Sequence, residues 1–269
     1  MPETIQNFIS PILEKSKPIL DYIVDIYMQG FVGKYIHGQG EVIRVLAYAG
    51  SILFVMISAY LLGSINFAII ISSTQYKQDI RNFGSNNAGM TNMMRTYGRK
   101  AAAFTLIGDA LKAVVACFIA YLLIGNLGAH IAGVFCMLGH IFPVYYKFKG
   151  GKGVVTAGAT MFMCNPIVFF IVITMFAIIV LFTKFISLAS IMCMLLYPLL
   201  LHALDPVWFG ILAGGEFGSW GMPFAVLMTA MVVVKHWENI KRLLNGKENK
   251  FSFKKSVKKA EKDIDKNSK

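Results

Sequence analysis

Long apolar runs alternate with short polar segments along most of this chain. Residues 46–72, 101–124 and 165–182 are almost uniformly apolar, and each run is close to the roughly 20 residues that a helix needs to cross the hydrocarbon core of a bilayer. The runs lack the apolar–polar alternation that marks the strands of a membrane β-barrel. A helix also satisfies its own backbone hydrogen bonds inside lipid. The pattern therefore predicts an all-α membrane helix bundle, built as one domain.

The composition agrees with this pattern. Of the 269 residues, 56% are hydrophobic and 15% are charged, whereas about a quarter of a soluble globular chain is charged. Residues 1–40 mix charged and apolar positions and lack the pattern of a cleaved leader, so we expect them to be retained. The four cysteines lie in separate apolar runs without paired or metal-ligand spacing, and we interpret them as packing residues: Cys117, Cys136, Cys164 and Cys193.

The distribution of charge predicts the orientation of the first helices, because Lys and Arg accumulate in cytoplasmic loops. Residues 1–44 carry four basic and five acidic residues, which favours an outside N-terminus. Residues 73–100 carry five basic residues against one acidic residue, which places them in the cytoplasm. A single helix over 46–72 then separates the two. The uncharged link 125–128 should join the second helix to a third that ends near Tyr146.

The side on which the C-terminal tail lies depends on whether the apolar stretch 154–182 crosses the membrane once or twice. If it crossed once, the tail 241–269, with eleven basic and four acidic residues, would end outside. A hairpin that turns at Asn165-Pro166 keeps the tail inside, and proline favours such a break. A sixth helix over 186–202 then leads out to the segment 203–221, which has no cation.

A seventh helix over 222–235 returns to the cytoplasm. The prediction is therefore seven transmembrane segments, with the N-terminus outside and the C-terminus cytoplasmic. It divides the chain into an extracytoplasmic extension (1–44), a membrane domain (45–240) and a basic cytoplasmic tail (241–269).

Unusual polar sequences all fall on the predicted cytoplasmic side, so separated segments can converge there. They are residues 83–95, 148–156, 187–190 and 236–239. Glycines in the first two segments allow a ligand to approach the backbone closely, and their amides can point at phosphate oxygens. These are Gly84, Gly89, Gly150, Gly151 and Gly153. Arg95 and Lys152 can supply compensating charge. Neutral hydrogen-bonding groups complete the candidate site: Ser85, Asn87, Thr91, Ser190, His236 and Asn239.

Each of these features also has a structural interpretation. Basic residues at helix ends obey the positive-inside rule without any ligand, and single glycines can be turns. Residues 149–153 lack the spacer and the Ser or Thr of a nucleotide P-loop. Asp109 and Lys112 lie three residues apart within an apolar helix and can pair on one face. Ionisable residues in a membrane helix are often functional, but a mutually neutralising pair can equally stay buried. Histidines 130, 140 and 202 can likewise be packing residues of the bundle.

The polar motifs together resemble one bacterial family, the acyl-phosphate-dependent glycerol-3-phosphate acyltransferases of PlsY type. The resemblance runs from about residue 60 to residue 251 and keeps the motifs in order. They are YLLGSI at 60–65, residues 84–95, GHIFP at 139–143 running into 148–156, SLAS at 187–190, and HWENIKRLLNG at 236–246. The chain departs from the usual family pattern at Asn66, Asn86, Met90 and Ala113. Asn tolerates a left-handed backbone better than most residues, so Asn86 is compatible with the loop.

This resemblance implies a seven-helix, N-out fold and a reaction. An acyl chain would pass from acyl phosphate to the sn-1 hydroxyl of sn-glycerol 3-phosphate, giving lysophosphatidic acid and inorganic phosphate. Ser85, Arg95 and Lys152 would hold phosphate, helped by Asn87, Thr91, Gly150 and Gly151. Ser190, His236 and Asn239 would place the glycerol part, with Lys152 among the catalytic groups. His236 could take the hydroxyl proton or only orient the hydroxyl. We expect no cofactor, metal or nucleic-acid partner.

Two rival functions fit the sequence less well. An acyl-CoA acyltransferase of the soluble type carries His followed four residues later by Asp, and neither His140 nor His236 has that partner. A phosphate or organophosphate transporter would build its site from broken helices near the middle of the membrane. Here the cationic motifs gather at one face instead. We therefore expect a multi-pass enzyme of the cell membrane with its active site at the cytoplasmic face.

Overall fold

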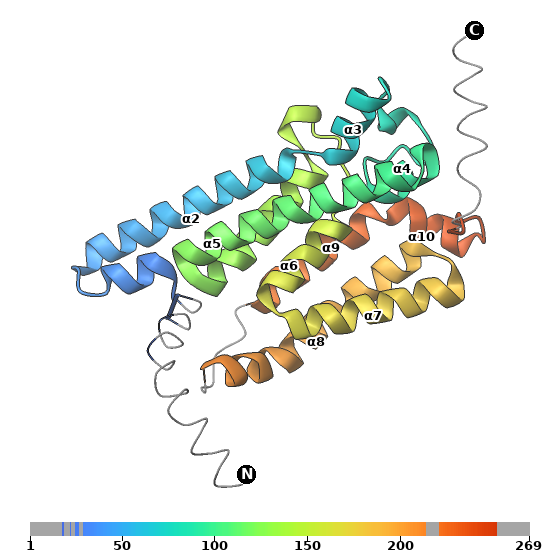
Figure 1. Ribbon diagram of the computed structural model, residues 1–269. Coiled ribbons are helices and arrows are strands. Elements are labelled where there is room, and N and C mark those ends of the chain that lie inside the picture. Colours follow the sequence, from blue (N-terminus) through green and yellow to red (C-terminus); the bar gives the residue numbers. More distant parts are fainter. Residues whose placement is uncertain (1–17, 19–21, 23–24, 27–28, 214–220, 252–269) are drawn as a thin grey trace, which may run out of the picture.

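The computed structural model describes residues 18, 22, 25–26, 29–213 and 221–251, and no strand occurs among them. The all-α prediction is therefore confirmed for this part of the chain (Figure 1). From residue 41 onward, the α-helices are α2 (Glu41–Ser64), α3 (Phe67–Gln75), α4 (Met90–Tyr97), α5 (Arg99–Ile141), α6 (Val154–Cys164), α7 (Pro166–Thr183), α8 (Ile186–Ala213), α9 (Gly221–Lys235) and α10 (Trp237–Leu244). Two short 3₁₀ helices, Ile80–Asn82 and Val144–Tyr146, lie in the connections.

The first apolar run is divided where the sequence suggested one continuous helix over 46–72. α2 ends at Ser64, and α3 begins at Phe67 after the capping residue Asn66. The Asn66 side chain accepts a hydrogen bond from the amide of Ile69 at 3.1 Å, which satisfies one of the free donors of a new helix. The predicted domain boundaries at 44/45 and 240/241 fall inside α2 and α10, respectively.

Helix α5 contains the turn predicted near residues 125–128. Ile124 and Gly125 leave helical backbone angles, and Gly125 has φ of 66°, which suits glycine. The Cys117 sulfur lies 3.5 Å from the carbonyl oxygen of Ala129. Twelve residues of straight helix would place these groups about 18 Å apart. The two halves of α5 therefore fold back on each other.

A second reversal joins α6 and α7 at the predicted Asn165-Pro166 site. The Asn165 side chain accepts a hydrogen bond from the amide of Val168 at 3.1 Å, and Pro166 occupies the first helical position. The ring centroids of Phe162 and Phe169, one on each helix, lie only 5.4 Å apart. This contact and the course of the chain in Figure 1 show that α7 turns back from α6.

Helix α8 is longer than the predicted helix over 186–202. It continues to Ala213 and contains Pro198 and Pro206. Within the extension, the buried carboxylate of Asp205 accepts a 2.9 Å hydrogen bond from Asn165. The first part of the segment 203–221, predicted to follow the sixth helix, is therefore helical, and a partner 40 residues away satisfies its carboxylate at Asp205. Residues 214–220 of the predicted outer segment lie outside the described residues.

Among the described residues, four helical stretches are long and apolar enough to cross a membrane, and two further apolar helices, α6 and α9, are shorter. The four are Glu41–Gln75, Arg99–Tyr146, Pro166–Thr183 and Ile186–Trp208. The second includes the reversal within α5. Seven crossings, and the side on which each terminus lies, remain predictions.

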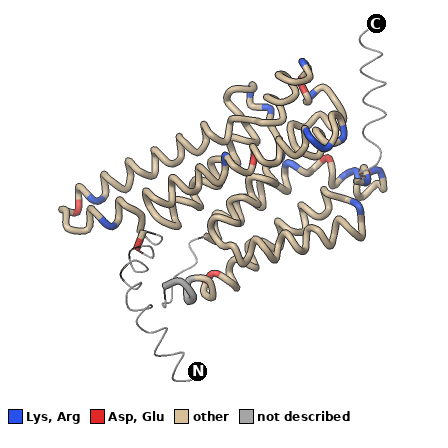
Figure 2. Tube along the Cα trace, viewed as in Figure 1, with Lys and Arg blue, Asp and Glu red and all other residues tan. Residues whose placement is uncertain are grey.

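Basic residues are concentrated at the end of the bundle that carries α3, α4 and α10 (Figure 2). At the opposite end, both signs of charge occur among the described residues. α2 packs along α5, α5 packs on α6, and α7 packs on α8, so that the polar connections meet at the basic end.

Asp109 and Lys112 form the pair that their spacing allowed. The Lys112 ammonium lies 3.0 Å from the Asp109 carboxylate and 3.0 Å from Nδ1 of His140. It also donates to the carbonyl oxygens of Gly63 at 2.8 Å and Ile65 at 2.6 Å, at the C-terminal end of α2. This buried lysine therefore ties α2 to both halves of α5, which favours a structural role for the pair.

Candidate active site

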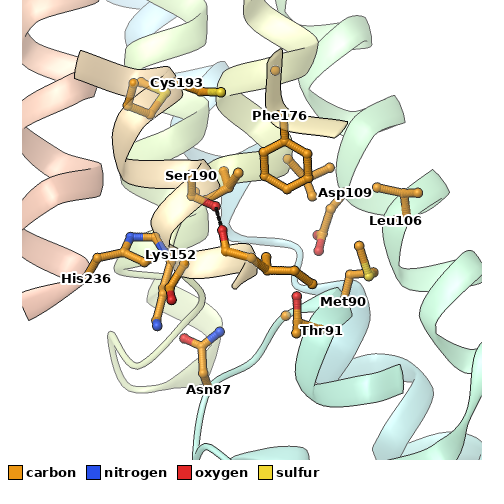
Figure 3. Close-up of a pocket in the computed structure, with 18 of the residues that line it drawn as sticks. Asn87, Met90, Thr91, Leu106, Asp109, Lys152, Phe176, Ser190, Cys193 and His236 are labelled. Carbon is orange, nitrogen blue, oxygen red and sulfur yellow. Dashed lines mark hydrogen bonds between the residues drawn. The ribbon is translucent and has the colours of Figure 1, made fainter. Parts of the chain in front are cut away.

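One cavity of about 580 Å³ lies among α4, α5, α6, α7, α8 and α10. Eight of the ten predicted site residues line it, although they come from four separated segments. They are Ser85, Asn87, Thr91, Arg95, Lys152, Ser190, His236 and Asn239. Figure 3 shows Asn87 and Thr91 on one side of this cavity and Lys152, Ser190 and His236 facing them.

Gly150 and Gly151 are not among the residues that line the cavity, which corrects the expectation that their amides point at phosphate. The amide of Gly150 donates to the carbonyl of Ile141 at 3.2 Å, and that of Gly151 donates to the carbonyl of His140 at 3.1 Å. A Cβ on Gly150 would lie 2.0 Å from the His140 carbonyl oxygen. These glycines therefore allow the loop to pack against the end of α5.

The loop before α4 is held by a residue that sequence analysis did not single out, Asn92. Its side-chain nitrogen donates to the carbonyls of Ile80 (3.2 Å), Phe83 (2.9 Å) and Asn87 (3.0 Å), while its oxygen accepts from the amide of Ser85 at 3.0 Å. Asn92 is only 1% exposed, and this burial, which indicates its structural role, is visible only in the structure. Asn92 therefore fixes the backbone that presents Ser85 and Asn87.

Left-handed backbone occurs twice in this loop. Gly84 has φ of 60°, and Asn86 has φ of 54°, the conformation for which Asn is better suited than most residues. The loop leads through Gly89 into the first turn of α4, whose residues Met90 and Thr91 line the cavity. The amides at the start of a helix favour an anion.

A hydrogen-bond network connects the opposite side of the cavity. The Lys152 ammonium donates to Oδ1 of Asn239, and the Asn239 amide nitrogen donates to the Glu248 carboxylate at 2.8 Å. Glu248 also accepts from Ser187 at 3.0 Å and from Arg242 at 2.8 Å. Burial acts to raise the pKa of Glu248, but these hydrogen bonds outweigh it and hold the pKa below its ordinary value.

Arg242 and Glu248 belong to the predicted basic tail, yet both line the cavity, which the sequence did not indicate. The available signal was the carboxylate of Glu248, two residues after the last motif ends at Gly246. Residues 252–269 of that predicted tail lie outside the described residues.

Two cations in the cavity wall lack a carboxylate partner. Asp109 is paired with Lys112, and Glu248 is paired with Arg242. Within the described part of the chain, Arg95 makes no hydrogen bond or ion pair, and Lys152 contacts only the neutral Asn239. Burial, together with repulsion from Arg242, lowers the pKa of Lys152 to about 8. Burial also lowers the pKa of Arg95 from a very high ordinary value. Both remain positive at neutral pH, so the site is complementary to an anion.

His236 enters this site as a neutral imidazole. Its Nδ1 lies 2.8 Å from the carbonyl oxygen of Val232, so Nδ1 carries the proton and Nε2 is left as an acceptor. Burial, followed by the charge of Lys152, lowers the pKa of His236 to about 4. Nearby, the Ser190 hydroxyl donates to the carbonyl of Ile186 at 2.9 Å, and its oxygen can still accept. The pair can accept hydrogen bonds from substrate hydroxyl groups.

The rest of the cavity is largely apolar, and the only further acidic, basic or histidine side chains on it among the described residues are Asp109 and His140, which contact Lys112. Its walls come from faces of α5, α6 and α7 and include Leu106, Val155, Phe162, Phe169 and Phe176. A cationic end and an apolar extension in one cavity fit an amphiphile with an anionic head group and a long chain.

Comparison with known proteins agrees with this chemistry. A family model described as glycerol-3-phosphate acyltransferase matches residues 53–246. The chain belongs to this family. The glycerol-3-phosphate acyltransferase of Finegoldia magna is 37% identical over 195 residues, which cover 72% of this chain and 93% of the relative. That of Thermoanaerobacter pseudethanolicus is 38% identical, covering 75% of this chain and 96% of the relative.

Solved structures place this acyltransferase in the PlsY type. A crystal structure of PlsY, an integral membrane glycerol 3-phosphate acyltransferase, in its glycerol 3-phosphate form is 35% identical, with a TM-score of 0.67. It covers 75% of this chain and 96% of the solved one. The lysophosphatidic acid form gives 34% identity and a TM-score of 0.65, covering 76% and 96% of the two chains. The predicted family and the assignment as an acyltransferase enzyme are therefore confirmed.

Proposed function

We propose that this acyltransferase transfers an acyl chain from acyl phosphate to the sn-1 hydroxyl of glycerol 3-phosphate, yielding lysophosphatidic acid and inorganic phosphate. The observation that carries the proposal is the pair of cations, Arg95 and Lys152, without carboxylate partners at the polar end of an amphiphilic cavity. The names of the solved relatives, in glycerol 3-phosphate and lysophosphatidic acid forms, support the acceptor and the product.

The reaction needs little beyond positioning and charge. The acceptor hydroxyl oxygen bonds to the acyl carbonyl carbon, the carbon–oxygen bond to phosphate breaks, and phosphate leaves with that electron pair. Phosphate is a stable leaving group, so no strong general acid is required. Fixed cations bring two anionic substrates together and stabilise charge in the transition state.

The remaining polar residues have separate tasks in this proposal. Ser85, Asn87 and Thr91 bind phosphate beside Arg95 and Lys152. His236 Nε2 accepts the hydrogen bond of the attacking hydroxyl, and the proton passes finally to the released phosphate. Ser190 and Asn239 orient the glycerol part. The described residues hold no cluster of metal ligands, and we propose a reaction without cofactor, metal or nucleic acid.

Product formation from defined substrates tests this function. Purified protein in lipid, given palmitoyl phosphate, glycerol 3-phosphate and excess chelator, should release lysophosphatidic acid and phosphate in equal amounts. Palmitoyl-CoA should not replace the donor. A strict requirement for acyl-CoA or a divalent ion would contradict the proposal, and glycerol 3-phosphate uptake into vesicles without product would favour a transporter.

We also propose that the enzyme crosses the cell membrane seven times with the active site on the cytoplasmic face. The basic end in Figure 2 is the end that carries α4 and α10, which supports this orientation. In a background without native cysteines, Lys184→Cys should be labelled from the cytoplasm and Ser219→Cys from outside; residue 219 lies outside the described residues. Labelling of residue 184 from outside would show a single crossing by residues 154–182.

A further inference from the structure

Three phenylalanines cluster beside the apolar part of the cavity where α6 turns into α7. The ring centroids of Phe162 and Phe169 lie 5.4 Å apart with an interplanar angle of 74°. Phe170 completes the group, 5.4 Å from Phe169 and 6.4 Å from Phe162. Edge-to-face rings at such distances stabilise one another. Phe162 and Phe169 line the cavity, whereas Phe170 is more than half exposed and braces the other two.

The apolar walls form a channel that leads to this aromatic group. On α6, the lining residues Val155, Gly158 and Phe162 lie on one helical face. On α7, the lining residues Phe169 and Phe176 lie about two turns apart on the same helical face. Helix α7 runs back toward the polar end of the cavity. Phe176 lines the same cavity as Ser190 and Lys152 (Figure 3).

The distance from charge to wall follows from helix geometry. Lys152 immediately precedes α6, and Phe162 lies near its last turn. The nine residue steps from Gly153 to Phe162 rise about 14 Å along the helix. A chain bound by its phosphate at Lys152 therefore meets the aromatic rings after a fixed length of channel.

We propose that Phe162 and Phe169 form the end wall of the acyl channel and limit the length of the acyl chain that this enzyme accepts. This inference rests on the proposed function. Each further methylene that finds no room in a tight apolar pocket changes discrimination by about tenfold or more. The residues at the end wall therefore determine which donors react well.

Gly158, about halfway along α6, leaves open space in the channel because it has no side chain. A Cβ at this position would lie 3.9 Å from the Phe169 ring and would meet no other neighbour within 4 Å. The space beside Gly158 is therefore channel rather than packed protein. A large side chain here should shorten the channel, just as a small side chain at the end wall should lengthen it.

Donor profiles of single variants test the proposal. We would measure kcat/KM for decanoyl, myristoyl, palmitoyl and stearoyl phosphate with wild type, Phe162→Ala, Phe169→Ala and Gly158→Leu. The alanine variants should raise the stearoyl-to-decanoyl ratio about tenfold, and Gly158→Leu should lower the palmitoyl-to-decanoyl ratio about tenfold. KM for glycerol 3-phosphate should stay unchanged. Phe182→Ala, at an 85% exposed position on the same helix as Phe169, is the matched control and should keep the wild-type profile.

The possible outcomes separate the two proposals. If an alanine variant does not fold, Phe162→Leu and Phe169→Leu should still shift the profile in the same direction by a smaller factor. Active variants with the wild-type profile would overturn the channel wall and would indicate that the chain leaves between α5 and α7. Absence of lysophosphatidic acid from wild type with every donor would instead overturn the proposed function.

Discussion

Two lysines of this enzyme, the buried Lys112 and the half-buried Lys152, differ in how the protein engages their charge. Lys112 is 5% exposed and is held by Asp109, two backbone carbonyls and His140. Lys152 contacts only the neutral amide of Asn239 and faces a cavity. The first lysine is fully engaged within the protein, whereas the second retains donors for another molecule. The partners of a buried cation, rather than its burial, thus separate a structural role from a binding role.

The largest effect should follow from removing the structural charge. Lys112→Met leaves the Asp109 carboxylate buried without its cation, which typically costs about 3 to 5 kcal/mol of folding free energy. The thermal unfolding midpoint of the purified protein should fall strongly, while kcat of the remaining folded fraction stays near that of wild type. Replacing both members, as Lys112→Met with Asp109→Leu, should recover part of the loss. An unchanged midpoint would contradict the structural role.

The binding cations should show the opposite behaviour. Arg95→Ala and Lys152→Ala should keep the wild-type unfolding midpoint but each should lower kcat/KM for glycerol 3-phosphate at least about tenfold to hundredfold. Charge-assisted hydrogen bonds of this kind contribute about 1.5 to 3 kcal/mol each. Lys100→Ala, at an exposed position on α5, is the matched control and should be nearly neutral. Equal losses in the control would place the site elsewhere.

Glu248 should have an intermediate effect because it acts through Asn239 and Arg242. Glu248→Ala leaves both without their acceptor, so Asn239 is held less firmly beside Lys152. We expect kcat to fall about tenfold, by the loss of roughly one charged hydrogen bond, while Glu248→Gln should restore part of it. Glu238→Ala removes an exposed carboxylate of α10 and should change little. A loss confined to protein yield would show that Glu248 only stabilises the fold.

The smallest effect should come from pH. With a pKa of about 8, Lys152 loses its charge as pH rises above 8. The kcat/KM for glycerol 3-phosphate should therefore fall by about tenfold per pH unit above that point, because it reports ionisation of the free enzyme. Lys152→Arg should have low activity, since a planar guanidinium replaces a compact ammonium, and its residual activity should lack this break. If the fall in kcat/KM above pH 8 persisted in Lys152→Arg, the titrating group would be a residue other than Lys152.

Local signals explain what the sequence by itself determined. Uniform apolar runs predict helices, and Asn165-Pro166 predicts a helix break, because each pattern acts within one short segment. The charge pattern indicated the polar segments that meet in the structure. The order of motifs identified the family, and eight of ten proposed site residues share one cavity.

Interactions between distant segments required the tertiary structure. The sequence left open whether Lys112 is structural or functional until its partners were known, and the carboxylate of Asp205 inside α8 is satisfied by Asn165, 40 residues away. From the sequence, Glu248 belongs to a solvated tail, but in the structure it accepts a hydrogen bond from Ser187, which lies 61 residues away. The sequence displays which groups are available to a segment. Folding decides which of them are paired, because the partners of a buried polar group come from elsewhere in the chain and set both its charge state and its freedom to bind substrate.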